Sequence, residues 1–319
     1  MTKVTVVMPA YNASSTIRAS LESVFSQTLP PSEVLILDDG STDETAMVAS
    51  SFVPRVQIIP GRHEGAAVAR NLLCAAAQGD FVAFLDSDDV WHPDYLRVQC
   101  EKFREYPAAA AYFTGHVDFY DDAVPVWPGE QDLSIEYIEA IEFLRRYNQT
   151  PGFFNMSFCC VPRRTLEQMG PEPFRLSPAE DWYFFNKIST CGPVVYYHAS
   201  LAAYRVRVGS LSSNRLALST ALVSACEMLE QQFSAVPDRR FAEIFADAHS
   251  EKRRLLAKIC LFQGKIADAR VQLERALATG RGVRSQLKTL LLLWSTHLPQ
   301  RLQPDWLAKH PRWKGIYRA

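Results

Sequence analysis

Short apolar runs alternate with helical patterns over the first hundred residues, and this alternation constrains the fold more than any other feature. The runs are four to five residues long and resemble buried strands: 4–8, 34–37, 56–59 and 81–85. Between them, residues 15–27 and 66–77 show the spacing of helices. Strands that alternate with helices predict an α/β fold in which a mostly parallel sheet is flanked by helices.

The last of these runs ends abruptly in acidic residues. FVAFL at residues 81–85 reads as a strand buried on both faces, and Asp86, Asp88 and Asp89 follow it directly. Open α/β sheets bind ligands past the carboxyl ends of their strands. A divalent cation such as Mg²⁺ or Mn²⁺ takes carboxylate oxygens and would offset the repulsion among these acids. A solvated acidic turn that caps the following helix is the alternative.

The second run ends in the same way, in DDGSTDE at residues 38–44. Two interpretations are open. The acids could simply shape the turn and the helix after it, or a carboxylate at the strand end could accept hydrogen bonds from a base or a ribose. Because two strand ends carry the same acid-rich sequence, the second interpretation is favoured.

The middle of the chain continues with mixed elements, and its end is helical. We expect strands at 109–120, 158–161, 194–197 and 201–206, and helices at 134–147, 163–169 and within 177–187. From residue 215 onward only helical patterns remain. The sequence therefore predicts a catalytic domain at residues 1–215 and an all-α C-terminal appendage at residues 216–319.

Composition is that of a soluble globular protein, with 48% hydrophobic and 22% charged residues. The charge is unevenly divided: residues 216–319 hold 17 Lys/Arg and 9 Asp/Glu, whereas the remainder is acidic. The seven cysteines form no CxxC pair. Reduced thiols, the lack of an N-terminal apolar leader and the lack of a membrane-length apolar run predict a cytoplasmic protein.

Four sequence pieces occur in a fixed order: VTVVMPAYN, LILDDGSTDET, GAAVARN followed by GDFVAFLDSDD, and AEDWYFF. Together they resemble family 2 glycosyltransferases of the GT-A, Rossmann-like fold, over residues 1 to about 215. The resemblance implies an inverting transfer from a nucleotide-sugar donor, above all a UDP-sugar, to a hydroxyl acceptor. The acceptor would be a saccharide or a lipid-linked saccharide in cell-surface or secreted polysaccharide synthesis. No nucleic acid partner is implied, and the oligomeric state is left open.

The resemblance also assigns nucleotide-binding roles. Pro9, Ala10 and Tyr11 match the first nucleotide-contacting turn. Asp39 matches the residue that hydrogen-bonds the uracil ring, and Arg70 matches the arginine of the ARN motif near the nucleotide side of the cleft.

Metal and catalytic roles follow from the remaining motifs. Asp86 and Asp88 match the family's D-x-D, in which Asp86 would face the ribose and Asp88 would bind Mn²⁺ or Mg²⁺, with Asp89 as an alternative ligand. Glu180 and Asp181 match the catalytic ED pair, and Asp181 is the expected general base.

One position departs from the family pattern. Many relatives end the domain with YR-x-H, whose histidine approaches the metal or the diphosphate, whereas Arg207 occupies that position here. A guanidinium suits phosphate oxygens rather than a metal, so Arg207 is expected to pair with the diphosphate. A surface position, or a pair with a nearby acid, is the alternative.

Other classes of function are weighed against a transferase. A degenerate site would make the chain a non-catalytic nucleotide-sugar or glycan-binding protein, but Asp39, Asp88 and Asp181 are intact. The helical appendage could make it a scaffold in a multi-enzyme assembly. A nucleotidyltransferase would need a glycine- and lysine-rich phosphate loop near the first strand, and none is found there.

The end of the chain is basic, with eight Lys/Arg and one acid, Asp305, in residues 279–319. Here an apolar stripe falls at helical spacing on Leu287, Leu290, Leu291 and Trp294. Such a stripe with flanking cations can lie in a membrane interface, which would place the protein at the inner face of the membrane. The same stripe could instead pack against the preceding helices or the catalytic domain.

Overall fold

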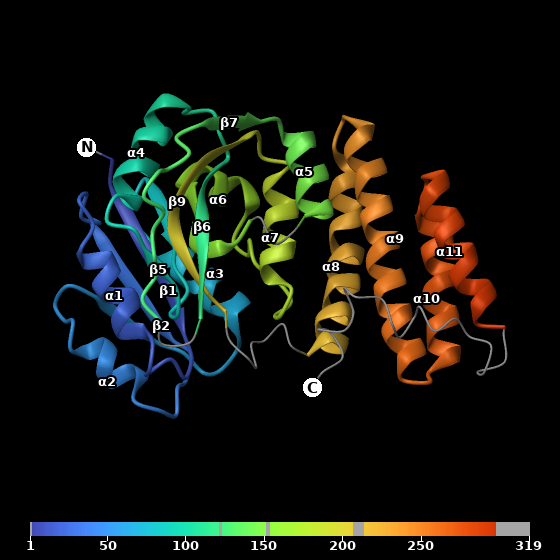
Figure 1. Ribbon diagram of the computed structural model, residues 1–319, viewed down its shortest axis with the longest axis horizontal. Coiled ribbons are helices and arrows are strands. Elements are labelled where there is room, and N and C mark those ends of the chain that lie inside the picture. Colours follow the sequence, from blue (N-terminus) through green and yellow to red (C-terminus); the bar gives the residue numbers. More distant parts are fainter. Residues whose placement is uncertain (1, 121–122, 151–153, 207–213, 298–319) are drawn as a thin grey trace. The chain divides into compact units, whose positions relative to one another are not determined.

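The computed structural model describes residues 2–120, 123–150, 154–206 and 214–297. The chain divides into two compact units, residues 1–208 and 209–319 (Figure 1). The expected domain boundary between residues 215 and 216 falls in the first turn of α8 (Arg215–Ala235). Each unit is described separately below.

The first unit alternates strands and helices as the sequence pattern predicts. In chain order its elements are β1 (Val4–Ala10), α1 (Ile17–Phe25), β2 (Glu33–Asp38), α2 (Thr45–Ser50), β3 (Gln57–Pro60), α3 (Ala66–Ala76), β4 (Phe81–Phe84), β5 (Val90–Trp91), α4 (Tyr95–Glu105), β6 (Ala111–Tyr120), β7 (Ile135–Ile138), α5 (Ala140–Gln149), the 3-10 helix η2 (Met156–Phe158), β8 (Cys159–Pro162), α6 (Arg163–Met169), α7 (Glu180–Ile188) and β9 (Val194–Val206).

The strands form one sheet in the order β3-β2-β1-β4-β8-β6-β9-β5, with β7 also paired to β9. The pairings β3–β2, β2–β1 and β1–β4 are parallel, which confirms the predicted parallel sheet for the first four strands. Beyond β4 the sheet is mixed, because β8 runs antiparallel to both of its neighbours while β6 and β9 are parallel. The carboxyl ends of β1, β2 and β4 therefore lie at one edge.

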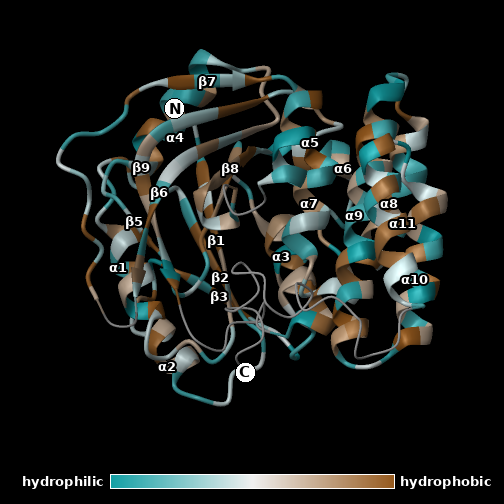
Figure 2. Cartoon of the chain, turned by 45° about the vertical axis from the view of Figure 1, so that its right-hand side comes forward, coloured by the Kyte–Doolittle hydropathy of each residue, from teal (hydrophilic) through white to brown (hydrophobic). Residues whose placement is uncertain are grey.

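Helices cover both faces of this sheet (Figure 1). On one face, alternate residues of β1 such as Val6 and Met8 pack with Ile17 and Leu21 of α1. On the other face, Phe84 of β4 makes edge contacts with the ring of Phe184 of α7. Because both of their faces are buried, the central strands β1, β2 and β4 are nearly all apolar, as Figure 2 shows for β1 and β2.

Three predicted elements were wrong in type or extent. The helix expected at 134–147 is split into β7 and α5, because residues 135–138 pair with β9. The strands expected at 194–197 and 201–206 form one continuous strand, β9, which follows β6 through register shifts beside Gly115. Val90 and Trp91 form a short strand, β5, which the sequence pattern does not predict and which also pairs with β9. In each case pairing with β9, distant in sequence, decides the backbone conformation.

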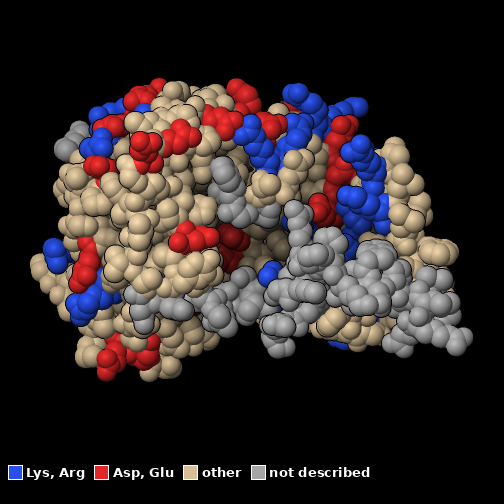
Figure 3. Space-filling model, viewed as in Figure 1, with Lys and Arg blue, Asp and Glu red and all other residues tan. Residues whose placement is uncertain are grey.

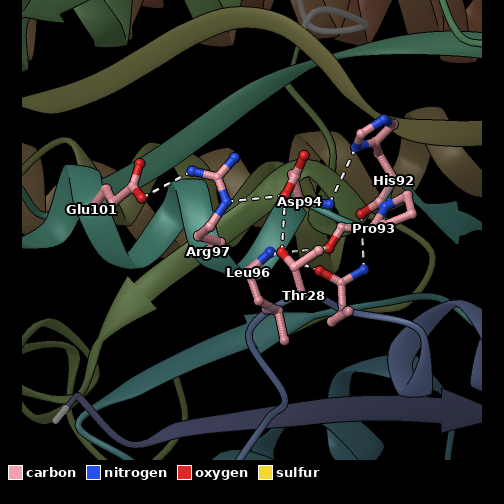
Figure 4. A network of polar contacts seen from close by, with 8 residues as sticks. Thr28, His92, Pro93, Asp94, Leu96, Arg97 and Glu101 are labelled. Atoms are coloured by element: carbon pink, nitrogen blue, oxygen red, sulfur yellow. Dashed lines mark hydrogen bonds and ion pairs between the residues drawn. The ribbon is translucent and has the colours of Figure 1, made fainter.

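The segment that follows the acidic residues is held against the connection between α1 and β2 (Figure 4). The backbone N–H of Thr28 donates to the Pro93 carbonyl at 2.8 Å. The side chain of Gln27 donates to the His92 carbonyl at 2.8 Å and accepts from the Leu96 N–H at 2.9 Å. These bonds fix the start of α4, so the acidic loop is anchored at both ends, by β4 and by this junction.

The second unit is helical in its described residues. It contains α8, α9 (Arg239–Phe262), α10 (Ile266–Thr279) and α11 (Val283–Ser295). Its apolar centre includes Leu256, Leu273 and Leu292 from three successive helices. None of the helices in the described residues combines the length and the apolar character that crossing a bilayer requires.

The bulge beside Gly115 gives a test of the fold. A Cβ at residue 115 would collide with the carbonyl oxygen of His198, which belongs to the backbone of β9 and cannot rotate away. We expect Gly115→Ala to lower the free energy of unfolding by about 1–3 kcal/mol, as overpacking does. Gly129→Ala is the matched control, because a Cβ there meets nothing within 4 Å. Urea denaturation measures both, and equal stability of the two variants would contradict the described packing of β6 on β9.

Candidate active site

Acidic side chains gather at the carboxyl end of β4. Figure 3 shows acidic residues lining a recess in the face of the molecule that it presents. The loop that carries Asp86, Asp88 and Asp89 begins where β4 ends, and the backbone N–H of Asp86 donates to the hydroxyl of Ser157 at 3.0 Å. Ser157 lies in η2, so a neighbouring segment fixes the first residue of the loop.

Arg70 joins this loop to the start of α7. Its side chain is only 6% exposed, and its guanidinium donates to Asp86 Oδ1 at 2.6 Å and to Glu180 Oε1 at 2.8 Å. The arginine lies in α3, the two acids in the loop after β4 and in the first turn of α7. A guanidinium is planar and has several donors, so one side chain can hold two carboxylates in fixed positions. Arg70 was predicted to lie near the nucleotide; that contact stays a prediction.

The acidic pair at the start of α7 is unequal. Glu180 is 7% exposed and is bound to Arg70, whereas Asp181 is half-buried and accepts a hydrogen bond from the Trp182 N–H at 2.6 Å. Burial and the neighbouring charge of Glu180 raise the pKa of Asp181 to about 6, against the opposing effects of that hydrogen bond and of Arg70. A carboxylate with this pKa is ionised near neutral pH and still binds a proton readily, as a general base must.

Asp89, considered as an alternative metal ligand, faces inward. It is 1% exposed, and its Oδ1 accepts the backbone N–H of Arg205 at 2.8 Å. The side chain of Arg205 in turn donates to the Asp88 carbonyl at 2.8 Å. Burial, with the charges of Asp88 and Asp86, raises the pKa of Asp89 well above its usual range. These contacts tie the acidic loop to the end of β9, which is a structural role.

The donor set fits a divalent cation shared with a substrate. Within the described residues, no cluster of three or more His, Cys, Asp or Glu side chains forms a complete metal cage. Asp86 uses one oxygen for Arg70, Asp89 is buried, and Asp88, the predicted metal ligand, is half-buried in the same loop. Mg²⁺-type ions are commonly held by one or two carboxylates together with substrate phosphates, so these residues fit such a site.

An aromatic side chain stands beside the ends of β1 and β2. Tyr11 is 44% exposed and stacks on the ring of His63, with centroids 4.2 Å apart. Next to it, the Asp39 N–H donates to the carbonyl of Ala10 at 2.8 Å. The buried Asp39 carboxylate accepts the backbone N–H groups of Glu64 and Gly65, at 2.9 and 2.8 Å, which fixes the loop before α3. Its predicted bond to a uracil ring would use the remaining lone pairs.

The structure brings most predicted site residues to one edge of the sheet. Tyr11 and Asp39 lie at the ends of β1 and β2, while Asp86 and Glu180 meet at Arg70. Arg207 lies outside the described residues.

Sequence reasoning missed three supporting residues: Ser157, His63 and Arg205. Each supports its partner through a contact that no local motif encodes, and for Ser157 and Arg205 the partner is 71 and 116 residues away. Of these three residues, only Arg205 lies in a motif that the sequence shows, the YRVR segment.

Similar folds occur among solved structures. S. aureus TarS 1-349, crystallised with UDP-GlcNAc, aligns with a TM-score of 0.70 at 17% identity, covering 92% of this chain and 90% of TarS 1-349. The mannosyltransferase PcManGT from Pyrobaculum calidifontis, in complex with GDP-Man and Mn²⁺, aligns with a TM-score of 0.57 at 20% identity, covering 96% of this chain and 84% of that one. The fold class is therefore the GT-A type of α/β fold, with a helical C-terminal region.

The sequence comparisons identify the family. The model of glycosyl transferase family 2 matches residues 5–170, and the chain belongs to this family. WfgD of Escherichia coli, a UDP-Glc:alpha-D-GlcNAc-diphosphoundecaprenol beta-1,3-glucosyltransferase, is 43% identical over 225 residues, which are 66% of this chain and 80% of WfgD. GlyA of Streptococcus pneumoniae is 28% identical over 298 residues, 88% of this chain but 38% of that glycosyltransferase. ExoW of Rhizobium meliloti, a succinoglycan biosynthesis protein, is 33% identical over 58% of this chain and 63% of its own.

The bridge made by Arg70 is open to a stability test. Arg70→Met leaves Glu180 buried beside Asp181 without its counter-charge, and we expect a loss of about 3–5 kcal/mol in the free energy of unfolding. Arg70→Met combined with Glu180→Gln should recover part of that loss, because the uncompensated charge is removed as well.

Arg97→Met is the matched control. Arg97 also binds two acids, Asp94 and Glu101, but its side chain is 43% exposed (Figure 4). Exposed pairs contribute about 0–1 kcal/mol. Chemical denaturation of the unmodified protein and the three variants measures these free energies of unfolding. If Arg70→Met is as stable as Arg97→Met, the bridge does not contribute to stability as described.

Proposed function

We propose that the protein is an inverting glycosyltransferase that moves a sugar from a UDP-sugar to a hydroxyl group of a saccharide or lipid-linked saccharide. The observation that carries this proposal is the Arg70 bridge, which joins the acidic loop after β4 to the Glu180–Asp181 pair. The bridge would hold the proposed nucleotide-binding edge and Asp181, whose pKa is raised, in one site. Membership of the family supports the reaction class.

In the proposed reaction, Asp181 accepts the proton of the acceptor hydroxyl as its oxygen attacks the anomeric carbon. The new glycosidic bond forms on the face opposite the nucleotide, and the bond to the diphosphate breaks, with its electron pair leaving on the UDP oxygen. Attack from the opposite face inverts the anomeric configuration. Glu180, bound to Arg70, holds the start of α7 and hence Asp181 in place.

Donor binding is assigned to the edge formed by β1, β2 and β4. Tyr11 offers an aromatic face to the base, Asp39 accepts from the uracil ring, and the exposed side of Asp86 faces the ribose. Pro9 and Ala10 shape the turn before Tyr11. Asp88 would hold Mn²⁺ or Mg²⁺ against the diphosphate, and the cation would stabilise the charge of the leaving group.

The biological setting follows from the relatives. WfgD is named for a UDP-Glc donor and a diphosphoundecaprenol-linked acceptor, and ExoW for succinoglycan biosynthesis. We therefore place this chain in polysaccharide synthesis, with a UDP-sugar donor. All seven cysteines lie in the described part of the chain and are unpaired, which supports a reducing, cytoplasmic location.

The assignment of the base is tested by Asp181→Asn. The amide keeps the size and polarity of the side chain but accepts no proton, so we expect the turnover number to fall about 10²–10⁴-fold with donor affinity nearly unchanged. In the unmodified protein the rate should rise as the pH increases through about 6, because Asp181 must lose its proton before it can act as a base. Asp181→Asn should lose this limb of the profile.

Initial rates of UDP release from UDP-sugars, measured with acceptor between pH 4.5 and 8, give both results. Unchanged turnover in Asp181→Asn, with loss of turnover in Glu180→Gln, would transfer the role to Glu180. If no nucleotide sugar releases its nucleotide in the presence of Mn²⁺ or Mg²⁺, the alternative of a non-catalytic binding protein replaces the proposal.

The metal site is tested by Asp88→Ala. We expect Mn²⁺-dependent binding of UDP to be lost, while the melting temperature of the ligand-free protein stays the same, because Asp88 lies in a loop rather than in the core. Glu105→Ala, which removes an exposed acid at the end of α4, is the control and should bind normally. Calorimetry with and without EDTA measures the effect, and metal-dependent affinity that survives Asp88→Ala would contradict the assignment.

A further inference from the structure

Helix α11 buries Leu292 in the apolar centre of the helical unit but leaves most of its other large apolar side chains exposed. Four of its large apolar side chains are exposed: Leu287 at 55%, Leu290 at 46%, Leu291 at 64% and Trp294 at 63% exposure. On the opposite side of the helix, Thr289 and Ser295 are buried at 0% and 3% exposure. A water-soluble helix buries its apolar stripe and exposes its polar residues, so this arrangement needs an explanation. It excludes the alternative that the stripe packs against the preceding described helices.

The rotation of α11 is fixed by two arginines of the neighbouring helices, Arg254, which is buried, and Arg270, which is half-buried. Arg254 of α9, 8% exposed, donates to Ser285 Oγ at 2.8 Å and to Thr289 Oγ1 at 3.2 Å. Arg270 of α10 donates to the hydroxyl of Thr296 at 3.0 Å and to its carbonyl at 2.9 Å. Turning the leucines inward would break these bonds and leave Arg254 with only its bond to Ser250 of the same helix, which is costly for a buried guanidinium. The outward apolar face is therefore a built feature of the helical unit.

The charged side chains of α11 itself are basic, and the acid Asp247 of α9 binds the backbone N–H groups of Arg281 and Gly282 at the start of the helix. Arg284 and Lys288 of α11 are both exposed and flank the stripe. Between Glu274 and Asp305 the sequence contains no acidic residue. In residues 298–319, which lie outside the described part, five Lys/Arg stand against Asp305 alone. A partner for this face is thus apolar and carries negative charge.

We propose that the outward face of α11, formed by Leu287, Leu290, Leu291 and Trp294, docks into the interface of an anionic lipid bilayer. Leucines enter the boundary between head groups and acyl chains, tryptophan favours that depth, and the two cations meet lipid phosphates. A single short helix gives weak, reversible binding that depends on charge. The contact is peripheral and independent of the proposed reaction, though it would bring the protein to any lipid-linked acceptor.

Vesicle sedimentation of the full chain tests this proposal directly. At low salt the protein should co-sediment with vesicles of 30% phosphatidylglycerol in phosphatidylcholine, and it should remain in solution with phosphatidylcholine alone. About 0.5 M salt should release most of it, because screening shortens the Debye length to a few ångströms. Leu291→Ser combined with Trp294→Ser should reduce the bound fraction at least fivefold. Arg284→Gln combined with Lys288→Gln should weaken binding to the anionic vesicles.

Val271→Ser is the matched control, since Val271 is an exposed apolar residue of α10 at 45% exposure. It should bind vesicles like the unmodified protein, and all variants should keep the circular dichroism and the UDP affinity of that protein. These two readouts separate a failure of docking from a failure of the proposed transferase.

Three results would overturn the proposal. The full chain could ignore anionic vesicles at low salt, or the Leu291/Trp294 double variant could bind them as well as Val271→Ser does. Equally, sedimentation velocity could reveal a dimer that the double variant dissociates, in which case a second copy of the chain covers the face. If only a chain ended after residue 297 bound vesicles, residues 298–319 would be the cover in the full-length protein, and the face would not be a docking site.

Discussion

The first unit depends on the ion pairs that Arg70 makes with Asp86 and Glu180. A guanidinium with 6% exposure is tolerated only because two carboxylates compensate its charge, and each acid is held in place by the same contact. As a result, α3, the loop after β4 and the first turn of α7 cannot move apart without leaving a buried charge uncompensated. A site assembled in this way is preorganised before any substrate arrives.

The same crowding of charge gives Asp181 its chemical character. Arg70 binds Glu180 and Asp86 directly, whereas Asp181 receives only a weaker, longer-range benefit from it and remains close to both acids. Burial first, and then the charge of Glu180, raise the pKa of Asp181 to about 6 while the pairs beside it stay intact. Arg70 thus fixes Glu180 and Asp86 by direct bonds. Asp181 is stabilised less by Arg70 and stays able to accept a proton.

In the helical unit, arginines have a different role. Arg254 and Arg270 bind hydroxyl and carbonyl groups of α11 and its end, so they set the rotation of that helix rather than the position of acids. Because the polar side of α11 is bound in this way, Leu287, Leu290 and Leu291 face outward, whereas Leu292 is buried. Both units depart from the rule that polar residues lie outside and apolar residues inside. The buried ion pairs of Arg70 and the exposed apolar face of α11 are each part of a region with a proposed function.

The sequence by itself determined the features that depend on neighbouring residues. The apolar runs at 4–8 and 81–85 specified strands of a parallel sheet, the acids after residue 85 indicated a candidate binding edge, and ordered motifs indicated the family. The tertiary structure decided everything that depends on distant partners. Residues 135–138 became a strand because β9 offered backbone groups to pair with, and Arg70 met Glu180 across 110 residues of chain. Helical spacing found the stripe on α11 but could not say which way it faces, because hydroxyl groups bound by arginines from two other helices fix that rotation.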